Sequence, residues 1–169
     1  MVTYTHAWAL SDGTVVYSGD DGSTKYRRSG SLSWRNSNPG NIRPGKFAVS
    51  CGAIGSFHGF AIFPTEAIGF SAIIALFKTP FYKSKSLRQA IYAYAPPDDN
   101  NNSAAYVNSV ATQLGVSSDT SVGVLSDAQL SELASAIRHV EGWSLGQETS
   151  VQTTANADER GGDIVSNEG

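Results

Sequence analysis

Four segments in the second half of the chain carry both start and stop signals for α-helices, and they constrain the fold more than any other feature. Prolines at 80, 96 and 97 end the first two because proline cannot continue a helix. Gly115 is a natural C-terminal cap for the third. The predicted helices are Thr65–Phe77, Ser86–Tyr94, Ser103–Leu114 and a fourth that runs from the N-cap Ser126 to Val140 or Glu141.

The fourth helix has the clearest signature. Ser126 and Gln129 form a capping box, in which each side chain accepts a hydrogen bond from the other residue's backbone N–H. Apolar residues then recur at helical spacing, at Leu130, Leu133, Ala134 and Ile137. We therefore expect one face of this helix to pack against a core.

Glu141 lies at the end of this helix, on the face where a carboxylate is least expected. At about 100° per residue, it projects within roughly 20° of Leu130 and 40° of Ile137, on the apolar stripe. Desolvation and the negative end of the helix dipole both favour the protonated acid. A neutral carboxyl group can donate a proton to a leaving oxygen, which predicts a general acid. The alternative is that the last turn frays and the side chain enters water.

Three other carboxylates are weaker candidates. Glu66 is the rival acid, but it lies in the first turn of its helix, where an ionised carboxylate interacts favourably with the dipole. Asp98 and Asp99 occupy a polar loop and could supply a second catalytic carboxylate, although turn formation explains them equally well.

The segment SWRNSNPGNIRPG, residues 33–45, is too rich in Asn, Pro and Gly to form a helix or a strand. Asparagine amides can bind sugar hydroxyl and N-acetyl groups, and Trp34 could stack on a pyranose ring. The alternative is that these asparagines bind their own backbone in consecutive turns. The candidate asparagines are Asn36, Asn38 and Asn41.

Length and composition bound the organisation of the chain. With 169 residues and 40% hydrophobic content, one globular domain is expected. We predict a polar lead or small hairpin over residues 1–28, the working domain over 29–146, and a disordered acidic tail over 147–169. A short edge strand is predicted at Phe60–Phe63.

Charge and cysteine content exclude several classes of protein. Residues 25–146 carry eleven Lys and Arg against seven Asp and Glu, so a mildly basic centre lies between acidic flanks. Cys51 and the three histidines lack metal-ligand spacing, so we expect no metal and no cofactor. No apolar run is long enough to span a membrane, no signal peptide is recognised, and no nucleotide-binding pattern is present.

Several segments resemble one known family of proteins. WRNSNPGNIRPGKF, GAIGSFHGFAIFPTEAIGFSAIIALF, YAPPDDNNNSAAYVNSVATQLGV and LSDAQLSELASAIRHVEGW occur in this order between Trp34 and Trp143. Together they resemble the lysozyme-like, peptidoglycan-cleaving domains of phage-tail and type VI secretion effector proteins. A weaker likeness to flagellar and autolytic glucosaminidases has the catalytic segment HVEGWS last, as in a circular permutation.

The resemblance implies a fold, an activity and a site. The expected fold is mainly α (α+β) and lysozyme-like, with about four or more helices and a short β element. The expected activity is cleavage of the peptidoglycan glycan strand, as by a muramidase, with Glu141 as general acid. Glucosaminidase and transglycosylase chemistry stay open. The expected substrate-binding residues are Trp34, Asn36, Asn38, Asn41, Arg43, Tyr94 and Asn100.

The resemblance also implies partners and a place of action. We expect a monomer that binds peptidoglycan glycan strands, with no nucleic acid partner and no membrane insertion; an immunity protein is an open question. It would act in the periplasm or cell wall of a target bacterium, delivered by a secretion system, by a phage or as part of a longer protein. The competing hypothesis is a non-catalytic peptidoglycan-binding or virion structural module.

Overall fold

The computed structural model describes residues 2–96, 102–153 and 164–168. The chain forms two compact units. The first comprises Met1–Ser71 together with Val140–Gly169, and the second comprises Ala72–His139. Two helices, α3 (Glu66–Phe77) and α7 (Asp127–Glu141), cross from one unit into the other. The last residue of α7, Glu141, therefore belongs to the first unit.

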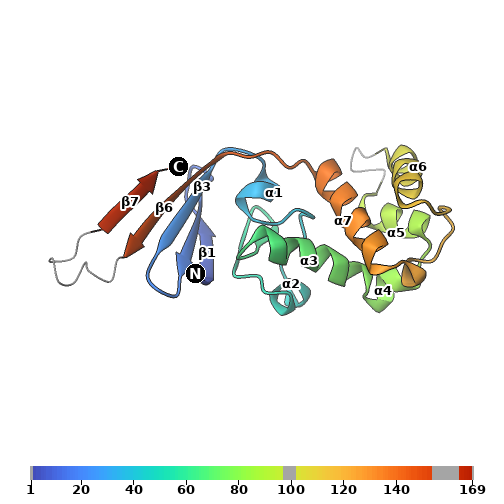
Figure 1. Ribbon diagram of the computed structural model, residues 1–169, viewed down its shortest axis with the longest axis horizontal. Coiled ribbons are helices and arrows are strands. Elements are labelled where there is room, and N and C mark those ends of the chain that lie inside the picture. Colours follow the sequence, from blue (N-terminus) through green and yellow to red (C-terminus); the bar gives the residue numbers. More distant parts are fainter. Residues whose placement is uncertain (1, 97–101, 154–163, 169) are drawn as a thin grey trace. The chain divides into compact units, whose positions relative to one another are not determined.

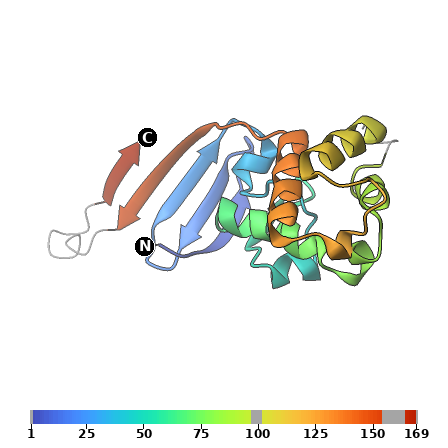
Figure 2. The ribbon, with the colours of Figure 1, turned by 45° about the vertical axis from the view of Figure 1, so that its right-hand side comes forward.

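An antiparallel sheet dominates the first unit, with the strand order β1-β2-β3-β6-β7 (Figures 1 and 2). Asp-Gly turns connect the first three strands, at Asp12-Gly13 and Asp21-Gly22, and both glycines have positive φ angles of 87° and 84°. Strand β6 pairs with β3, although the whole second unit lies between them in the sequence. The strands are β1 (Tyr4–Ala9), β2 (Val15–Gly19), β3 (Thr24–Arg28), β6 (Gln147–Thr153) and β7 (Ile164–Glu168).

This sheet corrects the predicted fold class. The chain is 43% helical and 21% strand, an α+β fold, so the prediction of a mainly α fold with one short β element is wrong. The predicted polar lead contributes three strands, and Gln147–Thr153, predicted to be disordered, forms β6. Backbone pairing with β3 orders this segment even though it has few large apolar side chains.

The rest of the first unit packs short elements beside the sheet. Its small core joins Ala7, Val15 and Tyr17 of the sheet to Ile62 of the β4–β5 hairpin. The predicted strand at Phe60–Phe63 overlaps β5. The short elements are α1 (Leu32–Arg35), α2 (Lys46–Ser50), β4 (Gly55–Phe57) and β5 (Phe60–Ile62).

The second unit is helical. It contains most of α3 and α7, with α4 (Pro80–Lys83), α5 (Leu87–Tyr94), α6 (Ser103–Leu114) and the 3-10 helix η2 (Val122–Val124). Its core side chains are at most 1% exposed: Ile73, Phe77, Leu87, Ile91, Val107, Val110, Leu133 and Ile137.

The structure confirms all four predicted helices, as α3, α5, α6 and α7. Both hydrogen bonds of the predicted capping box are present. Ser126 Oγ accepts from the backbone N–H of Gln129 at 3.1 Å, and Gln129 Oε1 accepts from the backbone N–H of Ser126 at 2.9 Å. Gly115 caps α6 with a φ of 71°. Local signals of this kind act within a few residues, which is why the sequence reveals them.

Candidate functional site

Asn38 organises the asparagine-rich loop from inside. Its Nδ2 donates to the backbone carbonyl oxygens of Ile42 and Ala61, both at 2.9 Å, and its Oδ1 accepts from the backbone N–H of Ile42 at 2.9 Å. The residue is fully buried. Both donor positions of the amide are therefore used within the fold, which speaks against the predicted role of Asn38 in sugar binding.

Asn36 and Trp34 are also buried parts of the loop rather than a binding surface. Asn36 is 0% exposed, and its Nδ2 donates to the carbonyl oxygen of Phe57 at 3.4 Å. Trp34 is 4% exposed, and the Arg27 guanidinium lies 4.4 Å from its ring centroid. The Arg27 guanidinium covers the indole ring, and neither residue is exposed, which speaks against the predicted contacts of Trp34 and Asn36 with a sugar.

Close packing of helix α3 fixes the path of the same loop. A Cβ atom added to Gly69 would lie 2.2 Å from the carbonyl oxygen of Ser37 and 2.9 Å from Cδ of Pro39. Glycine is therefore required where the helix crosses the loop. The hydrogen bonds of Asn38 and the packing of Gly69 therefore both restrain the loop in the residues just before Asn41.

Asn41 is the asparagine that faces a titratable group. Its backbone has a φ of 47°, a left-handed conformation that asparagine tolerates better than most residues. From this position Nδ2 donates to Oε2 of Glu141 at 3.1 Å. The bond joins the loop to the last residue of α7 within the first unit. The sequence predicted both residues as site members, and the structure brings them together.

The Glu141 carboxyl group is half-buried, and its pKa is raised above the usual value. Desolvation by burial is the larger cause and raises the pKa, whereas the hydrogen bond from Asn41 acts in the opposite direction. Because Asn41 donates to Oε2, the other oxygen, Oε1, is the one that can carry a proton towards a ligand. This arrangement is suited to proton donation.

The backbone after Glu141 is held against the start of the loop. Gly142 has a φ of 82° and ends α7. Its carbonyl oxygen accepts from Ser33 Oγ at 2.6 Å, and Ser31 accepts from the backbone N–H of Ser144 through its Oγ at 3.0 Å. These bonds restrain the last turn, so Glu141 has a defined position.

The remaining predicted residues divide between the two units. Arg43 is exposed in the first unit, with its guanidinium 5.2 Å from the Phe60 ring centroid. Tyr94 belongs to the second unit, where its ring stacks on Phe77 with centroids 5.8 Å apart. Asp98, Asp99 and Asn100 lie outside the described residues.

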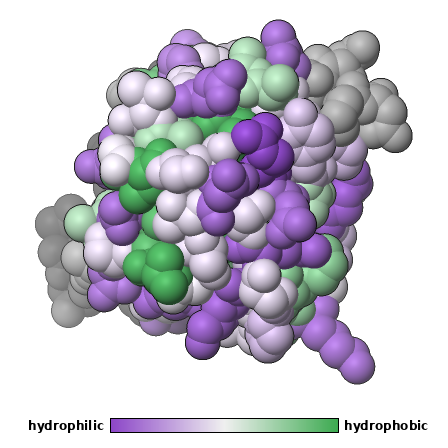
Figure 3. Space-filling model, turned by 90° about the vertical axis from the view of Figure 1, so that its right-hand side faces the viewer, coloured by the Kyte–Doolittle hydropathy of each residue, from purple (hydrophilic) through white to green (hydrophobic). Residues whose placement is uncertain are grey.

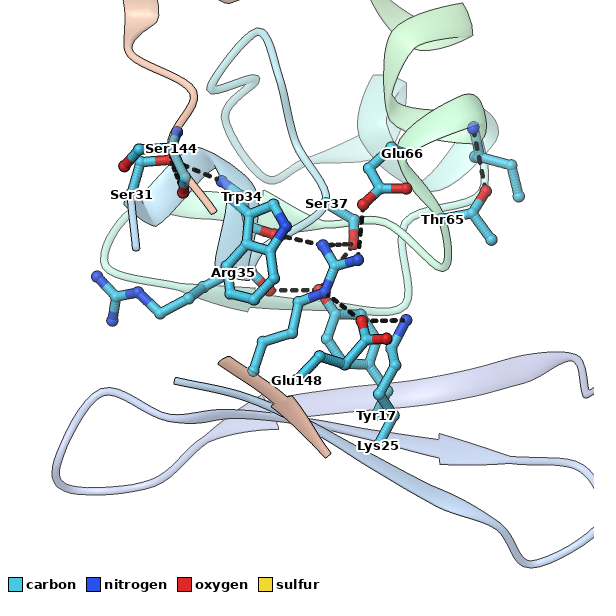
Figure 4. A network of polar contacts seen from close by, with 12 residues as sticks. Tyr17, Lys25, Ser31, Trp34, Arg35, Ser37, Thr65, Glu66, Ser144 and Glu148 are labelled. Carbon is cyan, nitrogen blue, oxygen red and sulfur yellow. Dashed lines mark hydrogen bonds and ion pairs between the residues drawn. The ribbon is translucent and has the colours of Figure 1, made fainter. Parts of the chain in front are cut away.

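A buried polar network that the sequence did not reveal connects the sheet to the loop (Figure 4). Arg27 of β3, 5% exposed, donates to the backbone carbonyl oxygen of Trp34 at 2.6 Å and to Ser37 Oγ at 3.2 Å. It also forms ion pairs with Glu66 at 2.6 Å and Glu148 at 2.9 Å. The Tyr17 hydroxyl extends the network to Ser37 Oγ at 2.9 Å.

Glu66, the rival candidate for the catalytic acid, and Lys25 both lie in this buried network. Glu66 is an ion-pair partner of Arg27, which favours its structural role over proton donation. Lys25, 7% exposed, lies 4.4 Å from the Tyr17 ring centroid and 4.0 Å from Glu148, yet burial lowers its pKa to about 8. The alternation of Lys25 and Arg27 in TKYRR was the sequence signal for this inward-facing pair.

Comparisons with known proteins add nothing to this geometry. No family model, curated protein or solved structure matches the chain. Within the described residues, no group of three or more His, Cys, Asp or Glu is arranged to hold a metal ion. The same part of the chain contains no helix with the length and apolarity needed to cross a membrane.

Proposed function

We propose that this protein cleaves the glycan strand of bacterial peptidoglycan, with Glu141 as general acid. The observation that carries the proposal is the half-buried Glu141 carboxyl group, whose pKa is raised by desolvation and whose Oε2 is bound by Asn41. The sequence resemblance to peptidoglycan-cleaving domains supplies the substrate class. Residues 25–146 carry an excess of basic residues, which suits an anionic polymer.

In the proposed reaction, Glu141 transfers its proton from Oε1 to the glycosidic oxygen as the bond from that oxygen to C1 breaks. The sugar ring then has oxocarbenium character and is captured by water or by a hydroxyl group of the substrate. The ionised Glu141 accepts the proton released by that nucleophile, which returns the site to its starting state. Asn41 stabilises the carboxylate between these two steps because it donates to Oε2.

Arg43 is the most accessible predicted binding residue of the first unit. It is exposed and follows Ile42, whose side chain is buried. Phe60 supports its guanidinium at 5.2 Å. We assign Arg43 to the carboxylates of the substrate, and Asn41 to the catalytic acid.

The test compares two variants of helix α7 in the full chain. Glu141→Gln keeps a hydrogen-bond acceptor for Asn41 but removes the proton donor. Glu132→Gln removes one exposed carboxylate from the same helix and is the matched control. Products released from purified sacculi are measured by mass spectrometry. We expect Glu141→Gln to lose about 100- to 10,000-fold in rate, with Glu132→Gln unchanged.

The results of this experiment distinguish catalysis by Glu141 from the alternative functions. Full activity of Glu141→Gln would remove this residue from the reaction. Binding of the wild-type chain to sacculi without any released product would favour the non-catalytic binding module. Product masses distinguish the remaining chemistries, because hydrolysis leaves reducing ends and transglycosylation leaves anhydro sugars.

A further inference from the structure

A basic segment of the second unit has no role in the proposed reaction. Residues 78–88, KTPFYKSKSLR, contain four cationic and no acidic side chains. Within the described part of the chain, the one ion pair formed by these four cations joins Lys78 to Asp127 at 3.3 Å. The four cations are Lys78, Lys83, Lys85 and Arg88. The segment therefore presents positive charge with little internal neutralisation.

A second segment, residues 118–124, runs alongside the first. The backbone N–H of Val122 donates to the carbonyl oxygen of Lys85 at 2.9 Å. The backbone N–H of Arg88 donates to the carbonyl oxygen of Ser118 at 3.0 Å. A Cβ atom added to Gly123 would lie 3.0 Å from Cγ of Lys83. The backbone next to Val124 is therefore packed against Lys83.

Two apolar side chains on these segments face solvent. Phe81 is 60% exposed and Val124 is 72% exposed. Tyr82, next to Phe81, instead packs on Phe77 of the core with ring centroids 4.9 Å apart. Lys85 Nζ lies 4.3 Å from the Phe81 ring centroid, so charge and aromatic surface are directly adjacent. On the face that it draws, Figure 3 shows hydrophobic residues exposed among hydrophilic ones.

We propose that this basic–apolar surface docks on the surface of an anionic phospholipid bilayer. It comprises Lys78, Phe81, Lys83, Lys85, Arg88 and Val124. Anionic head groups attract lysine and arginine, and the acyl boundary beneath them accepts exposed aromatic and aliphatic groups. A soluble polyanion or a glycan strand provides the charge but no hydrocarbon phase for Phe81 and Val124. A bilayer provides both.

The acidic groups on the neighbouring segment limit the attraction without removing it. Asp119 and Asp127 are exposed, and Asp127 is already paired with Lys78. The surface and these two acids together carry a net charge of +2, from four cations and two anions. Docking of this strength is reversible and salt-dependent.

The test uses sedimentation of the full chain with vesicles of phosphatidylglycerol and phosphatidylcholine, or of phosphatidylcholine alone. We expect binding to the anionic vesicles only, weakening as salt rises. The double variant Lys83→Gln/Lys85→Gln should lower the partition coefficient about 25-fold, since each cation near an anionic surface contributes about fivefold. Phe81→Ser should lower it about tenfold.

Matched controls come from the first unit. Lys46→Gln and Val49→Ser alter an exposed lysine and a valine that is 67% exposed, and both should bind vesicles like the wild type. Circular dichroism checks that every variant is folded. The proposal is overturned if the wild type does not bind anionic vesicles, or binds neutral ones equally. Equal vesicle binding by Phe81→Ser would show that charge alone carries the binding, without the apolar contact that the proposal requires. Self-association that Phe81→Ser abolishes, without vesicle binding, would indicate a second copy of the chain. Either result also overturns the proposal.

Discussion

Asn41 donates a hydrogen bond to Glu141 at 3.1 Å across 100 residues of sequence. The contact joins a loop residue in a left-handed conformation to the final residue of a helix. Burial raises the pKa of Glu141, and the donor from Asn41 limits that rise. The pair therefore sets the pH range in which Glu141 holds a proton.

Replacing Asn41 by glycine should move the pH dependence of glycan cleavage. Glycine accepts the positive φ of this position but removes the donor that stabilises the ionised carboxylate. The pKa of Glu141 should then rise. A general acid is active while protonated, so the alkaline limb of kcat/KM should shift to higher pH, while the maximal rate falls because the acid is less well oriented.

The control for backbone effects is His58→Gly. His58 also has a positive φ, of 57°, and is exposed in the β4–β5 turn. Its replacement should leave the alkaline limb in place. An unchanged limb in Asn41→Gly would show that the hydrogen bond does not influence the acid.

The stability of Glu141→Gln should exceed that of the wild type at neutral and alkaline pH. The folded-state pKa of Glu141 lies above the ordinary value of 4.5 for a glutamate. Its contribution to stability is therefore fully present below pH 4.5 and is lost as pH rises through the folded-state pKa. Glutamine has no charge to desolvate and shows no such loss. Urea unfolding at pH 4 and pH 8 should give a stability difference that grows with pH.

Glu132→Gln is the comparison for this measurement, because it removes a negative charge from an exposed position of the same helix. The pH-dependent gain should be absent there. Equal pH dependence in both variants would mean that net charge, rather than burial of Glu141, produces the effect.

Local signals explain what could be predicted from the sequence. The Ser126–Gln129 capping box marks the start of α7, and the apolar spacing after it together with Gly142 marks the end, all within one helix. Projection of Glu141 onto the apolar stripe correctly indicated a carboxyl group in a partly buried position. These inferences required no knowledge of distant contacts.

Distant contacts explain what could not be predicted. Strand β6 has little apolar periodicity of its own, and its backbone partner β3 lies at the other end of the chain. Asn38 and Asn41 look alike in sequence, but only the folded loop determines that Asn38 binds backbone and Asn41 binds Glu141. Trp34 likewise appears available until Arg27 is placed over its ring.

Loss of Arg27 should be far more damaging than loss of either carboxylate partner. Arg27→Met removes one hydrogen bond from the carbonyl oxygen of Trp34 and one from Ser37 Oγ. The first still accepts from the backbone N–H of Ser37 and the second keeps the Tyr17 hydroxyl. The substitution also removes the guanidinium that pairs with Glu66 and Glu148. Hydrogen bonds from a charged donor contribute about 1.5–3 kcal/mol each, so the loss of the two buried ones should cost about 3 kcal/mol or more. Urea unfolding at pH 7 measures the change.

Glu148→Gln provides the contrast within the same network. The Glu148 side chain is 43% exposed, and glutamine still offers an oxygen acceptor to Arg27. Its cost should be about 1 kcal/mol or less. Similar losses in the two variants would contradict the assignment of Arg27 as the centre of the network.

Lys25→Met should stabilise the protein at pH 7 by about 1–3 kcal/mol, because a buried charge is replaced by an apolar side chain of similar length. Burial lowers the pKa of Lys25 from 10.5 to about 8. Its stability contribution is therefore fully present above 10.5 and is lost as pH falls through 8. The advantage of methionine should accordingly shrink between pH 8 and pH 10.

Two kinds of contact favour the charged amine and oppose desolvation. The Glu148 carboxylate lies 4.0 Å from Lys25 Nζ, and the ring centroids of Tyr4 and Tyr17 lie 4.5 Å and 4.4 Å from it. Unfolding curves at pH 7, 8 and 9.5 decide between burial and these contacts. Destabilisation by Lys25→Met at pH 7 would mean that the Glu148 and aromatic contacts together outweigh desolvation. Lys46→Met, at an exposed lysine of the same unit, should change stability little and equally at each pH.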